Sequence, residues 1–167
     1  MKKIAIFLLC IFSLVPFASA KDKVEDMYTY DVEAIKGSAS APGRVVFKVW
    51  SYGKVDKLTR DLFKRNAVHA LIFKGIPASD DSSTNKGVRA LAPDSYDSNR
   101  ETYDSFFGSG EYLKYVELGN DGNILPGDRR KISNKEYKVG MICIVNKVAL
   151  RNFLKAKNII KELGAGY

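Results

Sequence analysis

The chain has 167 residues, of which 46% are hydrophobic and 28% are charged, and its formal net charge is +8. This composition excludes an intrinsically disordered or low-complexity protein. After residue 20 no apolar stretch approaches the roughly 20 residues that cross a bilayer, so we expect no transmembrane segment.

The first twenty residues have the pattern of a secretory signal peptide. Lys2 and Lys3 give a charged start, residues 4–17 are mostly apolar, and residues 18–20 form a small-residue cleavage site. We predict that cleavage follows Ala20. The mature protein is then exported, either periplasmic or extracellular, and residues 21–167 are the right length for one domain.

The cysteines fit this interpretation. Cys10 lies inside the predicted signal peptide, so Cys143 is the single cysteine of the mature chain, and an intramolecular disulfide is excluded. Lipid acylation of Cys10 is the alternative, but the large Leu9 before it and the apolar chain after it argue against a lipoprotein. We interpret Cys143, in an apolar strand, as a core residue and not as a nucleophile.

The amino-terminal half predicts two strands and a helix. In chain order these are a strand at 27–35, a polar break at 37–43, a strand at 45–52 and a helix at about 56–70. Residues 71–76 are either the last turn of the helix or a short third strand, because periodicity does not separate the two.

A long polar loop is predicted from 77 to 110. Within it, Ser98 and Glu101 form a candidate capping box that opens a short helix. That helix carries three aromatic residues, Tyr103, Phe106 and Phe107. These aromatic residues indicate a loop pinned to the body of the domain and not a linker between domains.

The carboxyl-terminal part alternates strands and turns before a closing helix. The segments are a strand at 112–118, a turn at 120–123, strands at 129–132 and 137–145, and a helix at 147–163 capped by Gly164. The order of elements predicts an α+β fold. We expect a mainly antiparallel sheet of about five or six strands, with two principal helices packed on one face.

Both principal helices have an apolar side that contains one asparagine. On the first helix this side holds Leu58, Leu62, Phe63, Ala67 and Ala70, and on the last helix Val148, Ala149, Phe153, Ala156, Ile159, Ile160 and Leu163. Asn66 and Asn152 fall among them. We interpret both as buried amides that hydrogen-bond neighbouring elements, the alternative being a ligand site between helix and sheet.

The opposite sides of the two helices are basic. The nine residues are Lys57, Arg60, Lys64, Arg65, Lys147, Arg151, Lys155, Lys157 and Lys161. If the helices lie side by side, these residues form one positive layer that attracts an anionic partner. Behind a signal peptide this partner is an anionic lipid, a polysaccharide or an acidic protein rather than nucleic acid. The alternative is charge that only keeps the protein soluble.

The sheet is predicted to have a second apolar face. Ile142 and Ile144 point away from the face that holds Cys143, and Trp50 and Tyr52 point the same way on their own strand. A strand that is apolar on both sides is usually covered twice. We expect the 77–110 segment or another chain to cover this face, since an exposed patch would mark an interaction site.

The sequence gives little support for catalysis. His69 is the only histidine, which excludes a multi-histidine metal site, and no nucleophile-elbow or phosphate-binding glycine motif is present. Carboxylate pairs for glycoside hydrolysis can be drawn from Glu101, Asp104, Glu111 or Glu117, but acids this numerous always supply a pair. We therefore expect no catalytic residue, no cofactor and no metal.

Several segments resemble small exported proteins of unknown function from Bacteroidales-type bacteria. They are residues 64–69, 72–75, 112–116, 120–122 and 137–141. The resemblance implies export and one compact domain, and it carries no activity or site residue. The order of a strand, a helix with alanine and asparagine, and a strand also resembles small envelope modules such as the TolB amino-terminal domain, at the level of fold alone.

Together these features predict a non-catalytic binding or assembly module of the bacterial cell envelope. The alternative is a small hydrolase that acts on an envelope polymer. Converging carboxylates in a cleft would favour the hydrolase, whereas a flat aromatic or basic patch would favour the binding module.

Overall fold

The computed structural model describes residues 29–35, 42–78 and 87–161. The predicted signal peptide and Gly164 lie outside these ranges. Within them, no helix combines the length and the apolar character needed to cross a membrane.

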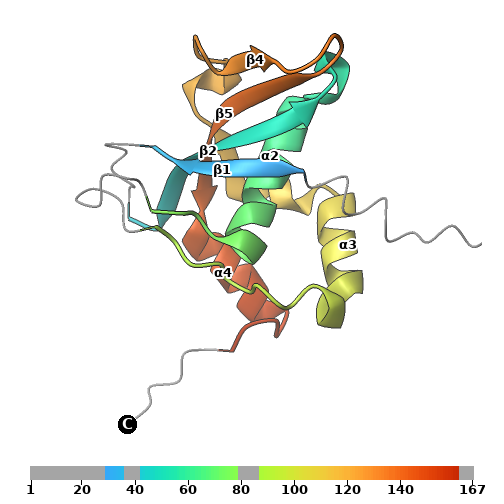
Figure 1. Ribbon diagram of the computed structural model, residues 1–167. Coiled ribbons are helices and arrows are strands. Elements are labelled where there is room, and N and C mark those ends of the chain that lie inside the picture. Colours follow the sequence, from blue (N-terminus) through green and yellow to red (C-terminus); the bar gives the residue numbers. More distant parts are fainter. Residues whose placement is uncertain (1–28, 36–41, 79–86, 162–167) are drawn as a thin grey trace, which may run out of the picture.

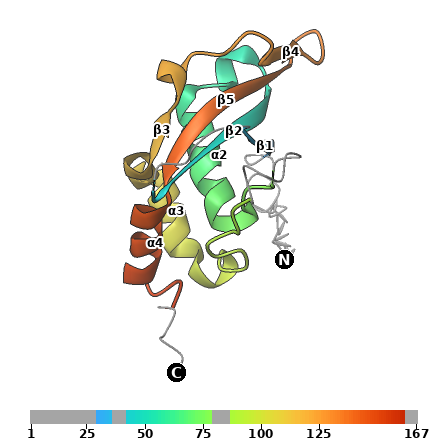
Figure 2. The ribbon, with the colours of Figure 1, turned by 90° about the vertical axis from the view of Figure 1, so that its left-hand side faces the viewer.

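The fold is α+β, as predicted, with a five-stranded antiparallel sheet (Figure 1). The strands are β1 (Tyr30–Ala34), β2 (Arg44–Gly53), β3 (Val116–Leu118), β4 (Arg129–Lys131) and β5 (Tyr137–Asn146). The order across the sheet is β1-β2-β5-β3, which Figure 2 shows from right to left, and β4 also pairs with β5. β2 and β5 follow their predicted limits closely, because each alternates buried and more exposed residues over most of its length.

Three helices accompany the sheet. They are α2 (Arg60–His69), α3 (Arg100–Gly108) and α4 (Lys147–Ala156). Short 3₁₀ turns lie at η1 (Val55–Lys57), η3 (Asp97–Asn99), η4 (Glu111–Tyr115) and η5 (Asn120–Gly122), and a π-helical turn, η2 (Ala70–Lys74), follows α2. In Figure 2, α2 lies behind β2 and β5.

The core lies between α2 and the inner side of the two long strands. Phe47 and Val49 of β2 and Cys143 of β5 point inward, and they meet Phe63 and Ala67 of α2; all five are fully buried. Full burial of a valine or phenylalanine side chain contributes roughly 1.5 to 3 kcal/mol, so this layer stabilises the packing of α2 on the sheet.

The end of the first helix combines both predicted alternatives. The helix continues into η2, whose turn ends at Gly75, where φ is 78° and the N–H donates to the carbonyl of Ala70 at 2.8 Å. The next residue, Ile76, forms an antiparallel bridge with Val88. Residues 71–74 are therefore the last helical turn, and Ile76 is extended.

The described part of the polar loop packs on the body, as predicted. Tyr103, Phe106 and Phe107 of α3 are buried, and Phe106 stacks on Phe153 of α4 with ring centroids 4.5 Å apart. The capping box is not formed, because Asn99 occupies the N-cap position and makes no side-chain capping bond. The prediction of a strand from residue 112 was also wrong, since η4 precedes β3 there.

The predicted buried side of α4 was only partly correct, because Phe153, Ile159 and Ile160 pack against the core but Val148 and Asn152 do not. Leu150 and Leu154 are fully buried, whereas Val148 is 53% exposed and Asn152 is exposed. The cause is the direct junction with β5: Asn146 ends the strand, and its side chain accepts a hydrogen bond from the N–H of Ala149 at 3.0 Å. This cap fixes the phase of the helix.

The helix also ends earlier than predicted. Asn158 adopts a left-handed conformation with φ 57°, and the N–H of Ile159 turns back to the carbonyl of Leu154 at 2.9 Å. This is the geometry of a helix C-terminal cap, for which asparagine is the usual substitute for glycine.

The described part of the 77–110 segment does not cover the second face of the sheet, and cover by another chain stays a prediction. Residues 87–110 lie with the helices, and none of the described helices packs over Ile142 and Ile144, which are half-buried. Trp50 is only 8% exposed there, because Gly140 lies opposite it and a Cβ on that glycine would come within 2.9 Å of the indole. This face is therefore a mixed charged and aromatic surface.

Candidate functional site

The nine basic residues predicted to form one layer fall into two groups. Both Figure 1 and Figure 2 place the start of α2 towards the β4 end of the molecule and α4 at the opposite end. η4 packs against both helices. The α2 group is Lys57, Arg60, Lys64 and Arg65, and the α4 group is Lys147, Arg151, Lys155, Lys157 and Lys161. The anionic partner therefore has to be sought at one group or the other.

Members of the α4 group line a concavity that we call the α4 pocket. Its volume is about 420 Å³. The lining residues are Pro42, Gly43, Arg44, Val45, Val88, Lys147, Val148 and Arg151. Three of these eight residues are cationic, and none is acidic.

The pairing of β2 with β5 brings the three cations together. Arg44 is the first residue of β2 and lies opposite Asn146, the last residue of β5. Because α4 begins directly after Asn146, Lys147 and Arg151 lie in its first turns next to Arg44. Reasoning from sequence identified Lys147 and Arg151 but missed Arg44, whose place depends on this long-range register.

Two of the three cations have no partner in the part of the chain that the structure describes. Arg44 pairs with Glu117 at 3.3 Å, and both side chains are largely exposed, which makes the pair weak. Lys147 and Arg151 form no ion pair or hydrogen bond with a described residue. The pocket therefore holds positive charge that the surrounding described chain does not neutralise.

The position of these cations opposes the helix dipole. The first turn of α4 contains no acidic residue, and Lys147 is its first residue. Cations at a helix N-terminus are unfavourable by roughly 0.3 to 1 kcal/mol, whereas an anion there is stabilised. A bound phosphate or carboxylate group would reverse this effect.

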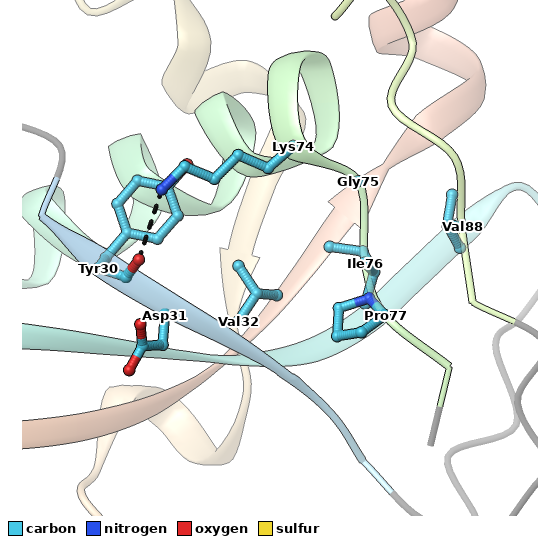
Figure 3. Close-up of a pocket in the computed structure, with 8 residues that line it drawn as sticks. All are labelled: Tyr30, Asp31, Val32, Lys74, Gly75, Ile76, Pro77 and Val88. Atoms are coloured by element: carbon cyan, nitrogen blue, oxygen red, sulfur yellow. Dashed lines mark hydrogen bonds between the residues drawn. The ribbon is translucent and has the colours of Figure 1, made fainter. Parts of the chain in front are cut away.

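A second concavity of about 580 Å³ lies beside β1, and we call it the β1 groove (Figure 3). Its lining residues are Tyr30, Asp31, Val32, Lys74, Gly75, Ile76, Pro77 and Val88. The ammonium group of Lys74 lies 3.9 Å from the centre of the Tyr30 ring and donates to the Tyr30 carbonyl at 3.5 Å. Partial burial lowers the pKa of Lys74, and the nearby Asp31 carboxylate opposes that shift.

His69 has a structural role beneath the β1 groove. Its Nδ1 lies 2.6 Å from the hydroxyl of Tyr30, and its ring packs against Phe73 and Phe107. Burial, together with Lys74 and Arg65, lowers its pKa to about 3. A neutral imidazole hydrogen-bonded to the Tyr30 hydroxyl therefore joins the end of α2 to β1.

Of the two asparagines, Asn66 is a core amide, as predicted. It is 1% exposed, and its amide donates to the hydroxyl of Ser51 at 3.0 Å. Cys143 is also fully buried, and burial raises the pKa of its thiol to about 12, which keeps it protonated. Neither residue lines one of the concavities described here.

The outer face of the sheet carries charge around Trp50. The indole N–H donates to Glu33 at 2.6 Å, and the ammonium groups of Lys48 and Lys138 lie 5.2 and 5.1 Å from the ring. Lys48 also pairs with Asp128 at 2.8 Å, and both of these side chains are largely buried. Sequence alternation indicated the aromatic face but not these cross-strand pairs, which depend on register.

Two of the four carboxylates considered for hydrolysis, Glu101 and Glu111, line a third concavity together with Lys157. A catalytic acid needs a carboxyl group shielded from water. Glu101 is exposed, and Glu111 pairs with Lys114 at 3.6 Å. The hydrolase therefore stays a prediction.

Within the described ranges, no group of three or more histidine, cysteine, aspartate or glutamate side chains is placed to hold a metal ion. No protein-family model, no curated protein and no solved structure matches the chain. The case for function therefore depends on the α4 pocket and the β1 groove themselves.

Proposed function

We propose that the protein is an exported binding module of the bacterial cell envelope that holds an anionic group in the α4 pocket. Export rests on the pattern of residues 1–20. The observation that carries the anionic ligand is the convergence of Arg44, Lys147 and Arg151 on a pocket with no acidic lining residue.

The chemistry of these residues supports binding. A guanidinium group is always protonated and offers several N–H donors in a fixed plane, which suits a phosphate or carboxylate. Arg44 reaches the pocket from β2, and Lys147 and Arg151 reach it from α4, so three cationic side chains from two elements surround the ligand. The partner is then a phosphate-bearing lipid headgroup or an anionic polysaccharide.

The test is co-sedimentation of the mature protein with vesicles. Phosphatidylcholine vesicles with and without phosphatidylglycerol are compared at low and physiological ionic strength, with a parallel arm that uses an anionic envelope polysaccharide. We expect retention on the anionic lipid or polysaccharide only, and we expect it to fall as salt rises.

A matched pair of variants locates the contact. Lys147→Gln with Arg151→Gln removes two charges at the α4 pocket, and Lys57→Gln with Arg60→Gln removes two at η1 and the start of α2. We expect the first variant to lose most of its retention and the second to keep it. Equal losses would show general charge attraction, and retention on neutral vesicles would contradict an anionic ligand.

A further inference from the structure

The register of the sheet determines which backbone groups of β5 face β2. The N–H of Gly140 donates to the carbonyl of Asp128 at 2.7 Å, and the carbonyl of Ile142 accepts from the N–H of Gly119 at 2.9 Å. Both contacts lie on the side of β5 away from β2. The backbone N–H and C=O groups of successive strand residues point to opposite sides. Those of Met141, and of every second residue before and after it, therefore hydrogen-bond to β2.

The same alternation of backbone direction determines which groups of β2 face β1. Val49 lies opposite Met141, so the backbone N–H and C=O groups of Val49 face β5. The backbone N–H and C=O groups of Lys48 and Trp50 face β1. Asp31 and Glu33 lie opposite these two residues and complete the pairing. The backbone N–H and C=O groups of the remaining β1 residues, Tyr30, Val32 and Ala34, therefore point out of the sheet.

The contact with Lys74 agrees with this assignment. Its ammonium group reaches the carbonyl of Tyr30 from outside the sheet, as Figure 3 shows. β1 is an edge strand of the described sheet, and no described residue outside the sheet hydrogen-bonds to the backbone of Val32 or Ala34. The β1 groove therefore opens onto backbone groups that an additional strand could use.

The opposite wall of the groove forms no backbone hydrogen bond with β1 among the described residues. Ile76 exchanges hydrogen bonds of 2.7 and 2.8 Å with Val88, which turns its polar groups away from β1. Pro77 has no N–H to donate. The groove thus has hydrogen-bonding groups on one side, an apolar wall on the other, and the charge of Lys74 at one end (Figure 3).

We propose that the β1 groove binds an extended peptide segment of a partner protein, which adds a strand to β1 and places an acidic side chain at Lys74. Strand addition uses main-chain hydrogen bonds for affinity and side-chain contacts for specificity. Lys74 selects an acid because no described carboxylate lies within ion-pair distance of it. The neighbouring Asp31 is already bound by Tyr52 and Lys138.

The test begins with two libraries of eight-residue peptides, one with a fixed glutamate and one with a lysine at the same position. Both are selected against the mature protein. We expect binders from the glutamate library only. In the best binder, N-methylation of successive residues should weaken binding at every second position, because only alternate N–H groups face β1. A scan without this alternation would overturn strand addition.

Hydrogen exchange then locates the peptide. The N–H of Val32 should exchange at least tenfold more slowly when the peptide is bound. Protection of that N–H in the free protein would show that the groove is already filled by this chain, and protection only at other strands would place the peptide elsewhere. Either result, or a selection without binders, would overturn the proposal.

Substitutions separate this site from the α4 pocket. Lys74→Gln should weaken the peptide about tenfold, whereas Lys135→Gln, an exposed lysine of the same chemistry, should not change its affinity. Lys147→Gln with Arg151→Gln should also leave the peptide bound. If Lys74→Gln and Lys135→Gln behave alike while both variants unfold as the unaltered protein does, the acidic contact is wrong.

Discussion

The N-termini of α2 and α4 have the same kind of capping hydrogen bond, but only α2 has an acid in its first turn. At α2, the hydroxyl of Thr59 accepts the N–H of Leu62 at 3.3 Å, and Asp61 follows in the first turn. At α4, Asn146 supplies the capping bond, but the first turn has no acid and begins with Lys147. Both helices begin with a cation, but Asp61 offsets Arg60 in the first turn of α2, whereas no acid offsets Lys147 in the first turn of α4.

The two helices also differ in what surrounds them. α2 packs along the inner side of the sheet, where a stable helix supports the core. The start of α4 opens onto the α4 pocket, where Arg44 adds a further cation. A local rule that is broken at one place and obeyed elsewhere is typical of a functional site. The comparison therefore directs experiments to α4.

The largest expected effect tests whether α4 is anchored as firmly as α2 despite its charges. Leu150→Ala should lower the free energy of unfolding by roughly 2 to 5 kcal/mol, because it removes a fully buried side chain. Val148→Ala, two residues away and 53% exposed, should change it by less than about 0.5 kcal/mol. Urea denaturation measures both, and similar losses would show that the phase of α4 is different.

The asparagines extend the comparison to the polar groups of the two helices. Asn66→Leu should cost roughly 1 to 3 kcal/mol, because the buried hydroxyl of Ser51 loses its donor. Asn152→Leu, on the exposed side of α4, should be within about 0.5 kcal/mol of neutral. Thermal unfolding of the two variants checks this, and a neutral Asn66→Leu would remove Asn66 from the core network.

The fate of these asparagines shows what sequence patterns can and cannot establish. In α2 most apolar residues fall on one side, so periodicity predicted the burial of Phe63 and Ala67 correctly, although Val68, which lies off that side, is also fully buried. In α4, apolar residues are spaced so that two different sides fit the pattern. The choice between them depended on where β5 ends and Asn146 caps the helix, which is local geometry and not periodicity.

The candidate sites were harder to predict than the strands. The limits of β2 and β5 followed from alternation, but the α4 pocket depends on Arg44 lying opposite Asn146, about a hundred residues away in the chain. The β1 groove likewise depends on the place of Lys74 beside Tyr30. Such pairs are set by register, which a single sequence specifies only through the packing of the whole sheet.

The other end of α2 gives a pH-dependent prediction. His69 has a pKa of about 3 in the folded protein because of burial, against an ordinary value of 6.5. Between these two pH values the imidazole of His69 is therefore protonated in the unfolded chain and neutral in the folded protein. Stability is fully present above pH 6.5 and falls as the pH drops towards 3.

Between pH 7 and 5 we expect the free energy of unfolding to fall by about 1 to 2 kcal/mol. His69 is the only histidine, so His69→Gln should make this interval nearly flat. Urea denaturation at both pH values measures the effect. A slope that survives the substitution would have to come from another group and would contradict the buried, neutral imidazole.

The smallest expected effect tests the comparison between the helix starts most directly. Lys147→Glu gives α4 the acid that α2 already has in Asp61, so it should stabilise the protein by about 0.3 to 1 kcal/mol at low ionic strength. The same substitution should abolish retention on phosphatidylglycerol vesicles, because it places a negative charge in the α4 pocket.

The control is Lys157→Glu, which makes the same charge change at the C-cap of α4, where an acid is unfavourable and should destabilise by a similar amount. Thermal unfolding at low and high salt measures both variants. A gain in stability with loss of binding would mean that Lys147 is kept for the ligand at a cost to the helix. A loss of stability would instead mean that Lys147 supports the fold.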